Sequence, residues 1–239
     1  MFKYLPTKAK LVFEDKKNNI AVFEIDKLYR GWGTTLGNAL RRVLLSSLTG
    51  AAVTAVKIKG VSHEFSTIPG VKEDVVEIML NLKKIRLRII GKEEEKLFLK
   101  VKGKGEVKAG DIKKNANVKI INPEEKIATI TDNKTTLEME LTVQKGIGYE
   151  PVEQRKTTKV PIGTILLDAI YSPIKKVGYE VEDVRVGKRT DFNKLRLSIQ
   201  TDGSITPTEA LIEASELLLE HFSLIKESFK EGKSKKDEA

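Results

Sequence analysis

The chain has 239 residues, of which 40% are hydrophobic, and this is enough apolar material for one large domain or two small ones. The absence of cysteine excludes disulfides, thiolate nucleophiles and cysteine-bound metals. No apolar run approaches the roughly 18 residues of a membrane span, and the first residues lack the apolar segment of a signal peptide. We therefore expect a globular, cytoplasmic protein that does not contact a membrane.

The formal net charge of +9 is concentrated between Lys83 and Lys126, where 14 basic residues stand against 7 acidic ones. In KLFLKVKGK, residues 96–104, the lysines alternate with apolar residues, a pattern typical of the solvated face of a β-sheet. A nucleic-acid interface is the open alternative, although no recognition helix or aromatic platform is visible. The lysines of such an interface would be Lys100, Lys102 and Lys104.

The first elements along the chain are two strands, residues 8–13 and 20–25, followed by a short helix over residues 34–49. Thr34 or Thr35 can cap this helix, and Gly50 suits the position after its end. Its apolar stripe comprises Leu36, Leu40, Val43, Leu44 and Leu48. The opposite side presents Asn38, Arg42 and Ser46, which form either an ordinary solvated face or a docking face.

A strand at residues 51–59 precedes a second helix, whose apolar face comprises Val71, Val75, Ile78, Met79 and Leu82. Glu73 and Asp74 in its first turn, with Lys83 and Lys84 in its last, complement the helix dipole. Residues 85–145 are predicted to be rich in short strands, and residues 146–161 to form an extended connecting loop. Further strands are expected at residues 164–169, 178–186 and 195–200.

The last helix has a strong start signal, with Thr206 as the cap, Pro207 at the first helical position and Glu209 completing a capping box. Its stripe contains too much apolar surface to face solvent, so the helix must meet a substantial partner. The stripe comprises Leu211, Ala214, Leu218, Phe222, Ile225 and Phe229. Residues 231–239 have almost no apolar side chain and are predicted to begin a disordered linker.

These elements predict an α+β fold in which both chain ends, residues 1–49 and 173–230, form one subdomain with few strands and two helices. Residues 50–172 form an inserted β-rich subdomain. Because so small an end subdomain leaves apolar helix surface uncovered, we expect a homodimer with a helix-bundle interface. The interface residues are expected to be Leu36, Leu40, Leu44, Leu211, Leu218, Phe222 and Ile225.

The residues that usually carry catalysis are scarce. The histidines, His63 and His221, lie far apart and have no metal-ligand spacing. We interpret His221 as structural and His63 as a hydrogen-bonding loop residue or, alternatively, a positioned contact. The glycines of GWGTTLG do not have the dinucleotide-binding spacing, and no acidic cluster suits magnesium. The sequence therefore predicts no catalytic residue, no metal, no cofactor and no small-molecule substrate.

Two long stretches closely resemble the N-terminal domain of the alpha subunits of bacterial DNA-directed RNA polymerase. They are LYRGWGTTLGNALRRVLLSSLTGAAVTAVKIKGVSHEFSTIPGVKEDVVEIMLNLK and PIGTILLDAIYSPIKKVGYEVEDVRVGKRTDFNKLRLSIQTDGSITPTEALIEA. The resemblance covers residues 8–225. It implies a non-catalytic scaffold that homodimerises and then recruits the large catalytic β and β′ subunits for transcription.

The resemblance also implies roles for individual residues. The second arginine of LGNALRR, Arg42, matches a contact with β, and Leu45 lies on the adjoining surface. Lys83 and Leu167 match positions implicated in assembly, and residues 171–191 resemble the β′-facing region. With His63 added as a positioned contact, the residues expected to bind β are Arg42, Leu45, His63 and Lys83. Those expected to bind β′ are Leu167, Tyr171, Arg185 and Arg189.

Members of this family continue through a linker into a helical C-terminal domain that binds promoter DNA. This sequence stops at Ala239. We therefore expect a truncated chain, with a naturally short chain as the alternative, and contact with DNA only through the assembled enzyme.

Overall fold

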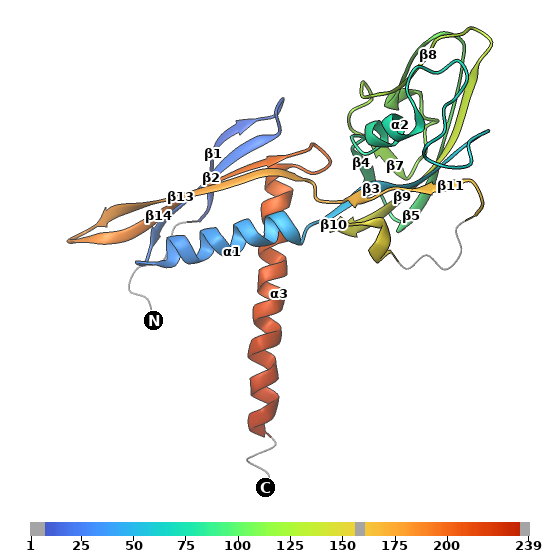
Figure 1. The fold of residues 1–239 in the computed structure, drawn as a ribbon. Coiled ribbons are helices and arrows are strands. Elements are labelled where there is room, and N and C mark those ends of the chain that lie inside the picture. The colour runs from blue at the N-terminus through green and yellow to red at the C-terminus, as the bar shows by residue number, and fades with distance from the viewer. Residues whose placement is uncertain (1–7, 156–160, 235–239) are drawn as a thin grey trace. The chain divides into compact units, whose positions relative to one another are not determined.

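The computed structural model describes residues 8–155 and 161–234, and the chain divides into two compact units (Figure 1). The end unit combines Met1–Leu48 with Ile174–Ala239, and the insert unit is the continuous segment Thr49–Pro173. Helices and many antiparallel strands occur together, which confirms the predicted α+β class.

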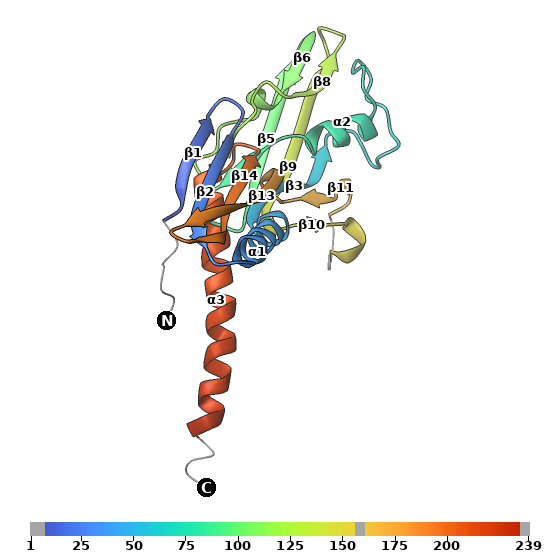
Figure 2. The ribbon, with the colours of Figure 1, turned by 90° about the vertical axis from the view of Figure 1, so that its left-hand side faces the viewer.

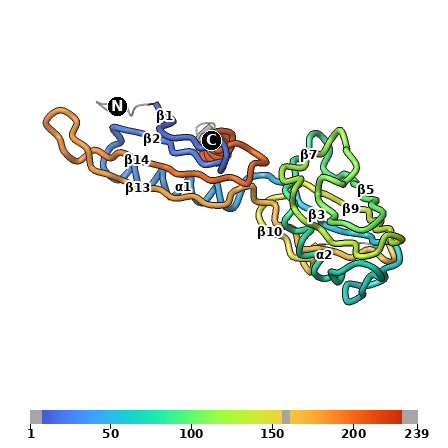
Figure 3. The backbone as a smooth tube through the Cα atoms, turned by 90° about the horizontal axis from the view of Figure 1, so that it is seen from above, coloured from blue at the N-terminus to red at the C-terminus, as the bar shows by residue number. Residues whose placement is uncertain are grey.

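The end unit is built on one antiparallel sheet with the strand order β1-β2-β14-β13 (Figure 3). Its strands are β1 (Lys10–Asp15), β2 (Ile20–Leu28), β13 (Ile174–Val186) and β14 (Arg189–Thr201). Helix α1 (Trp32–Ser46) packs on β13 and β14, and helix α3 (Pro207–Ser234) packs against α1. First and last segments of the chain thus share one core.

Helix α1 begins two residues before its predicted start, because Gly31 and not a threonine is its N-cap. Gly31 has a φ of +85°, in the left-handed region that favours glycine, and its N–H donates to Asn193 Oδ1 at 2.8 Å. The expectation of a Thr34 or Thr35 cap was therefore wrong.

The other glycines of the GWGTTLG motif let α1 lie close to the sheet. A Cβ added at Gly33 would come within 2.6 Å of Val181, and one at Gly37 within 2.6 Å of the Tyr179 ring. Such distances cannot be accommodated without moving the helix. The motif that imitates a dinucleotide fingerprint thus has a packing role.

Helix α3 confirms the predicted capping box. The Thr206 N–H donates to Glu209 Oε2 at 2.8 Å, and the Glu209 N–H donates to Thr206 Oγ1 at 3.1 Å. The helix continues to Ser234, so the linker predicted from residue 231 does not begin there. The remainder of that predicted linker, residues 235–239, lies outside the described residues.

The insert unit contains a four-stranded antiparallel sheet with the order β11-β3-β9-β5 and three two-stranded ribbons. The strands of the main sheet are β3 (Thr49–Ile58), β5 (Glu94–Lys102), β9 (Thr136–Ile147) and β11 (Thr164–Leu166). The ribbons pair β4 (Leu87–Ile89) with β7 (Val118–Ile120), β6 (Gly105–Lys108) with β8 (Lys126–Ile130), and β10 (Tyr149–Glu150) with β12 (Ala169–Ile170). Short helical segments are α2 (Val75–Leu82) and the 3-10 turns at Ala109–Asp111 and Val152–Gln154.

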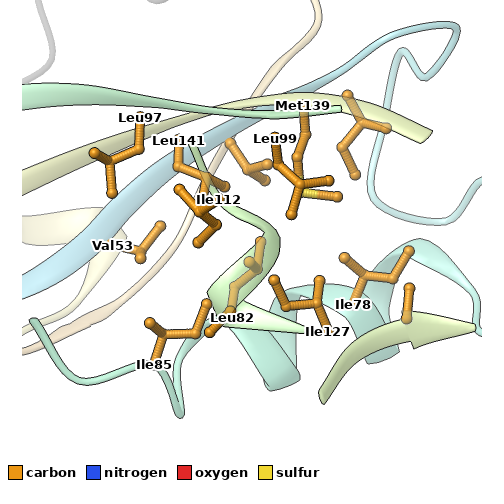
Figure 4. Close-up of a cluster of buried hydrophobic side chains, with 14 of the residues drawn as sticks. Val53, Ile78, Leu82, Ile85, Leu97, Leu99, Ile112, Ile127, Met139 and Leu141 are labelled. Carbon is orange, nitrogen blue, oxygen red and sulfur yellow. The ribbon is translucent and has the colours of Figure 1, made fainter. Parts of the chain in front are cut away.

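The core of the insert unit lies between α2 and the main sheet. Figure 4 shows Ile78 and Leu82 of α2 facing the side chains of β5 and β9, such as Leu99 and Met139. The apolar face of α2 therefore covers a sheet. Val71, which was predicted to belong to this face, lies before the helix and forms an isolated bridge with Ile130.

Two local predictions within the insert unit were wrong. Gly50 lies inside β3 and not after a helix, and a Cβ there would overlap the carbonyl oxygen of Tyr171. The predicted loop at residues 146–161 includes the end of β9, strand β10 and a 3-10 turn, while residues 156–160 lie outside the described part. Strand β10 forms because Tyr149 pairs with Ile170, a long-range partner that local sequence patterns do not reveal.

Glu73 precedes α2, whose N-cap is Asp74, and has a structural role within the insert unit. Only 4% of Glu73 is exposed. Its carboxylate accepts hydrogen bonds from the N–H and hydroxyl of Thr129 and lies 2.8 Å from Lys126 Nζ. Burial alone would raise the pKa of Glu73, but the hydrogen bonds from Lys126 and Thr129 outweigh it, so the pKa is lowered.

We expect Glu73→Gln to lower the free energy of unfolding by about 1 to 2 kcal/mol near pH 7. A lowered pKa in the folded state contributes stability above the unfolded pKa, and this is lost as the pH falls through the folded pKa. The deficit in unfolding free energy of the variant, relative to the original chain, should therefore become smaller as the pH is lowered. Urea unfolding of both proteins between about pH 7 and pH 3 measures this, and a deficit independent of pH would contradict it.

Candidate assembly surfaces

The outward face of α1 carries two arginines beside an apolar residue. Arg41, Arg42 and Leu45 are exposed, and Leu40 and Leu44 on the opposite side are buried. Neither guanidinium forms an ion pair or hydrogen bond with another residue in the described part of the chain. This face thus presents positive charge that the described residues of the end unit do not neutralise.

The predicted dimer residues of α1 mostly belong to the core of the end unit itself. Leu40 and Leu44 pack with residues of the sheet and with Ala210 and Ala214 of α3. Their burial leaves no surface for a second chain, so their place in the predicted interface is corrected. Leu36 is half-buried.

The apolar side chains of helix α3 change from buried to solvent-exposed along its length. One stripe of apolar and small residues on α3, which we call the α3 seam, has the spacing of a coiled coil, with successive residues separated alternately by four and three positions. It comprises Leu211, Ser215, Leu218, Phe222, Ile225 and Phe229. Leu211 and Leu218 are half-buried against the unit, whereas Phe222, Ile225 and Phe229 are 62%, 57% and 75% exposed. Both side views show the C-terminal half of α3 extending away from the sheet of its unit (Figures 1 and 2).

The other arginines predicted from sequence lie at the turn between β13 and β14. Arg189 is held by Asp191, with its Nε and Nη2 at 2.9 and 2.7 Å from the carboxylate, and its guanidinium lies 5.1 Å from the centroid of the Phe192 ring. Arg185 Nε donates to the carbonyl of Gly187 at 2.9 Å. Both side chains are exposed, and these contacts orient them within their own turn.

Lys83 of the insert unit is engaged with an acidic residue that the sequence did not single out. Its Nζ lies 2.8 Å from Asp168 Oδ2, and Asp168 Oδ1 accepts the Val152 N–H at 3.1 Å. The hydrogen bond from Lys83, and then that from Val152, holds the pKa of Asp168 below its ordinary value. The pair therefore fixes the 3-10 turn at Val152–Gln154 to the end of α2.

A second polar contact fixes the same segment. Arg155 Nη1 donates to the carbonyl of Thr54 at 2.9 Å, and Arg155 Nε lies 3.3 Å from Glu150 Oε2, which also accepts the Tyr171 hydroxyl. Burial raises the pKa of Tyr171 to about 12. Sequence patterns gave no signal for Arg155, Glu150 or Asp168, because each is an isolated charge in a polar segment whose partners are distant in sequence.

Two residues predicted to contact β′ are buried within the insert unit. Leu167 is 1% exposed and belongs to its main core, and Tyr171 is 4% exposed. Neither side chain offers a surface to another protein, so these two assignments are corrected. The exposed apolar residues beside them are Ile147, Tyr149 and Ile170. Since Tyr149 and Ile170 pair across β10 and β12, we call these three residues the ribbon patch.

His63 lies in the exposed loop before α2. Its ring Nδ1 is 3.2 Å from Ser66 Oγ, which is the local hydrogen bond considered for it, and the neighbouring Phe65 is also exposed. This hydrogen bond holds the loop, and the imidazole ring stays exposed to a partner protein. His221 also has a local contact, because its ring Nδ1 lies 2.8 Å from the carbonyl of Leu217.

We expect Asp168→Ala to loosen residues 148–155, because it removes both the ion pair with Lys83 and the acceptor for the Val152 N–H. Amide hydrogen exchange in this segment should accelerate about tenfold. Asp132→Ala is the control, since among the described residues Asp132 accepts a local turn hydrogen bond from the Lys134 N–H and has no ion pair. Unchanged exchange in the Asp168 variant would show that the pair does not hold the segment.

The basic face of the insert sheet is largely paired with carboxylates. Glu138 of β9 lies 2.6 Å from Lys100 and 3.0 Å from Lys59, and Glu140 lies 2.7 Å from Lys96. The hydrogen bonds from Lys100 and Lys59 lower the pKa of Glu138. These cross-strand pairs reduce the positive potential that a nucleic acid would meet.

No group of three or more histidine, aspartate or glutamate side chains suited to a metal ion occurs within residues 8–155 and 161–234. In the same residues, none of the helices combines the length and hydropathy needed to cross a membrane.

Comparison of the sequence with known proteins points to one family. Residues 56–172 match the model described as the RNA polymerase Rpb3/RpoA insert domain. The chain is 50% identical over 217 residues to the DNA-directed RNA polymerase subunit alpha of Alkaliphilus oremlandii, covering 91% of this chain and 68% of that protein. It is 48% identical over 223 residues to the subunit alpha of Aquifex aeolicus, covering 93% and 70% respectively.

A third relative, the subunit alpha of Alkaliphilus metalliredigens, is 52% identical over 202 residues, covering 84% of this chain and 64% of that protein. The chain thus spans about two thirds of the length of these relatives. The extent and level of identity confirm the resemblance read from the sequence: the chain belongs to the family of alpha subunits of DNA-directed RNA polymerase.

Proposed function

We propose that this chain is a non-catalytic scaffold subunit that homodimerises and nucleates assembly of the catalytic β and β′ subunits for transcription. It acts in the cytoplasm, requires no cofactor and meets DNA only through the assembled enzyme. The observation that carries the proposal is the α3 seam, whose C-terminal half is bare although its N-terminal half is packed in the end unit.

The energetic argument for a homodimer rests on that bare half. Fully burying a large apolar side chain is worth about 1.5 to 3 kcal/mol, so Phe222, Ile225 and Phe229 provide a substantial driving force. A heptad-like seam is self-complementary, and a second copy of the same helix offers the matching surface. Leu211 and Leu218, which are half-buried, extend the proposed interface toward the end unit.

The contact with β is proposed for the outward face of α1. Arg42 has no carboxylate partner among the described residues, and its guanidinium can form charge-assisted hydrogen bonds with a partner while Leu45 supplies apolar contact. His63 is retained as a further contact. Lys83 supports assembly through Asp168, by fixing the segment at Val152–Gln154, which lies in sequence between Tyr149 and Ile170 of the ribbon patch.

One contact with β′ is proposed for Arg185 and Arg189 of the end unit, and a separate one for the ribbon patch of the insert unit. The patch supports this role because three large apolar side chains, two on the ribbon and Ile147 at the end of β9, are exposed within the insert unit.

Coexpression with β and β′ tests the proposal. The expected result is one complex that contains two copies of this chain, and a dimer when the chain is purified alone. Sedimentation equilibrium at about micromolar concentration measures the latter. A stable monomer would contradict the dimer, and failure to copurify the large subunits would contradict the scaffold role.

The alternative, direct nucleic-acid binding by the lysine-rich insert, is less well supported because Glu138 and Glu140 neutralise three of the exposed lysines. It predicts a gel shift at moderate salt that disappears on neutralising Lys100, Lys102 and Lys104. We expect no such shift.

A further inference from the structure

A basic hollow lies on the insert unit, and none of the residues assigned to assembly is among the described residues that line it. Its volume is about 400 Å³. Its apolar floor includes the buried Leu97 and Val118, the exposed Ile90 also lines it, and the three lysines of its lining, Lys113, Lys114 and Lys119, form its rim. Among the described residues that line it there is no carboxylate and no aromatic ring.

The rim is fixed by hydrogen bonds before any ligand arrives. The Lys113 N–H donates to the carbonyl of Phe98 at 2.8 Å, and the Ile90 N–H donates to the carbonyl of Asn117 at 2.8 Å. The Asn117 side chain donates to Glu95 at 2.7 Å. A binding site that already has a fixed shape loses little conformational entropy when a ligand binds.

The rim lysines differ from three paired lysines on and beside the main sheet. Lys59, Lys96 and Lys100 each have a carboxylate within 3.0 Å. Within the described residues, the side chains of Lys113, Lys114 and Lys119 have no such partner. Three like charges around an apolar floor form a surface complementary to an anionic ligand with an apolar part.

We propose that this hollow binds an acidic segment of another protein, which inserts an aliphatic side chain between the three lysines. The volume suits about two leucine-sized side chains. A single-stranded nucleic acid fits less well, because base stacking requires aromatic rings and the lining contains none. The proposal goes beyond the scaffold role and does not depend on it.

Selection of displayed random peptides of about twelve residues on the purified protein tests this proposal. The expected peptides combine several Asp or Glu residues with Leu, Ile or Val. Their affinity should fall about tenfold or more in the rim variant Lys113→Glu, Lys114→Glu, Lys119→Glu. The matched control is Lys102→Glu, Lys104→Glu, Lys134→Glu, which changes the net charge equally on exposed lysines outside the hollow and should leave the affinity within about twofold.

Ile90→Ser provides a second variant that keeps every charge, and it too should weaken the peptides because it removes an exposed apolar side chain from the lining. Circular dichroism melts establish that each variant is folded. The proposal is overturned if no acidic peptide is enriched, if both lysine triples weaken the peptides equally, or if a single-stranded DNA oligonucleotide binds the hollow and the peptides do not. Loss of the large subunits from the rim variant would also overturn it, because the hollow would then belong to the assembly surface.

Discussion

Replacing Phe222 by Glu is expected to convert the dimer into monomers, with a rise of about a hundredfold or more in the dissociation constant. Phe222 is the first residue of the exposed part of the α3 seam, so the change would place a charge on each side of an apolar interface. It should not unfold the chain, because the side chain is 62% exposed within its own unit. Sedimentation equilibrium gives the dissociation constant directly.

Leu224→Glu is the matched control for this prediction. Leu224 is 65% exposed on the same helix but lies outside the α3 seam, so the same charge should leave the dimer intact. If Leu224→Glu separates the protomers and Phe222→Glu does not, the interface lies on another face of α3.

Replacing Arg42 by Ala is expected to leave the dimer intact and to weaken binding of β by about ten- to a hundredfold. The side chain is exposed and has no carboxylate partner within the described residues, so its removal should cost the end unit little stability. Thermal melting, sedimentation and a titration with purified β separate these three effects.

Two further variants test whether the effect of Arg42→Ala is specific to this position and to the guanidinium group. Lys17→Ala removes an exposed positive charge from the turn between β1 and β2 and should leave β binding unchanged. Arg42→Lys keeps the charge but loses the planar donor pair, and should recover only part of the affinity. If Arg42→Ala unfolds the chain or abolishes the dimer, the two-faced interpretation of α1 is wrong.

The features that the sequence predicted well are local. The capping box of Thr206 and Glu209 and the exposed side of α1 depend on residues within one or two turns, and periodicity reveals such features. Periodicity also indicated that Leu40 and Leu44 are apolar-face residues. It could not say whether their partner is a second chain or, as the structure shows, the sheet and helix of the same unit.

The features that the sequence missed depend on contacts between distant residues. Lys83 and Asp168 are 85 positions apart, and no local pattern reveals that the two meet. The ribbon of β10 and β12 depends on the pairing of Tyr149 with Ile170, and the surrounding sequence has the composition of a loop. The burial of Leu167 and Tyr171 likewise follows from tertiary packing.

Labelling of single cysteines tests the central claim most directly, because the chain has no cysteine of its own. Phe222→Cys, Ile225→Cys and Phe229→Cys should react with a thiol reagent about tenfold more slowly at dimer-forming concentration than after dilution. Arg42→Cys and Leu224→Cys should react at the same rate under both conditions. Seam cysteines that label as fast as Leu224→Cys in the concentrated protein would contradict a homodimer formed through α3.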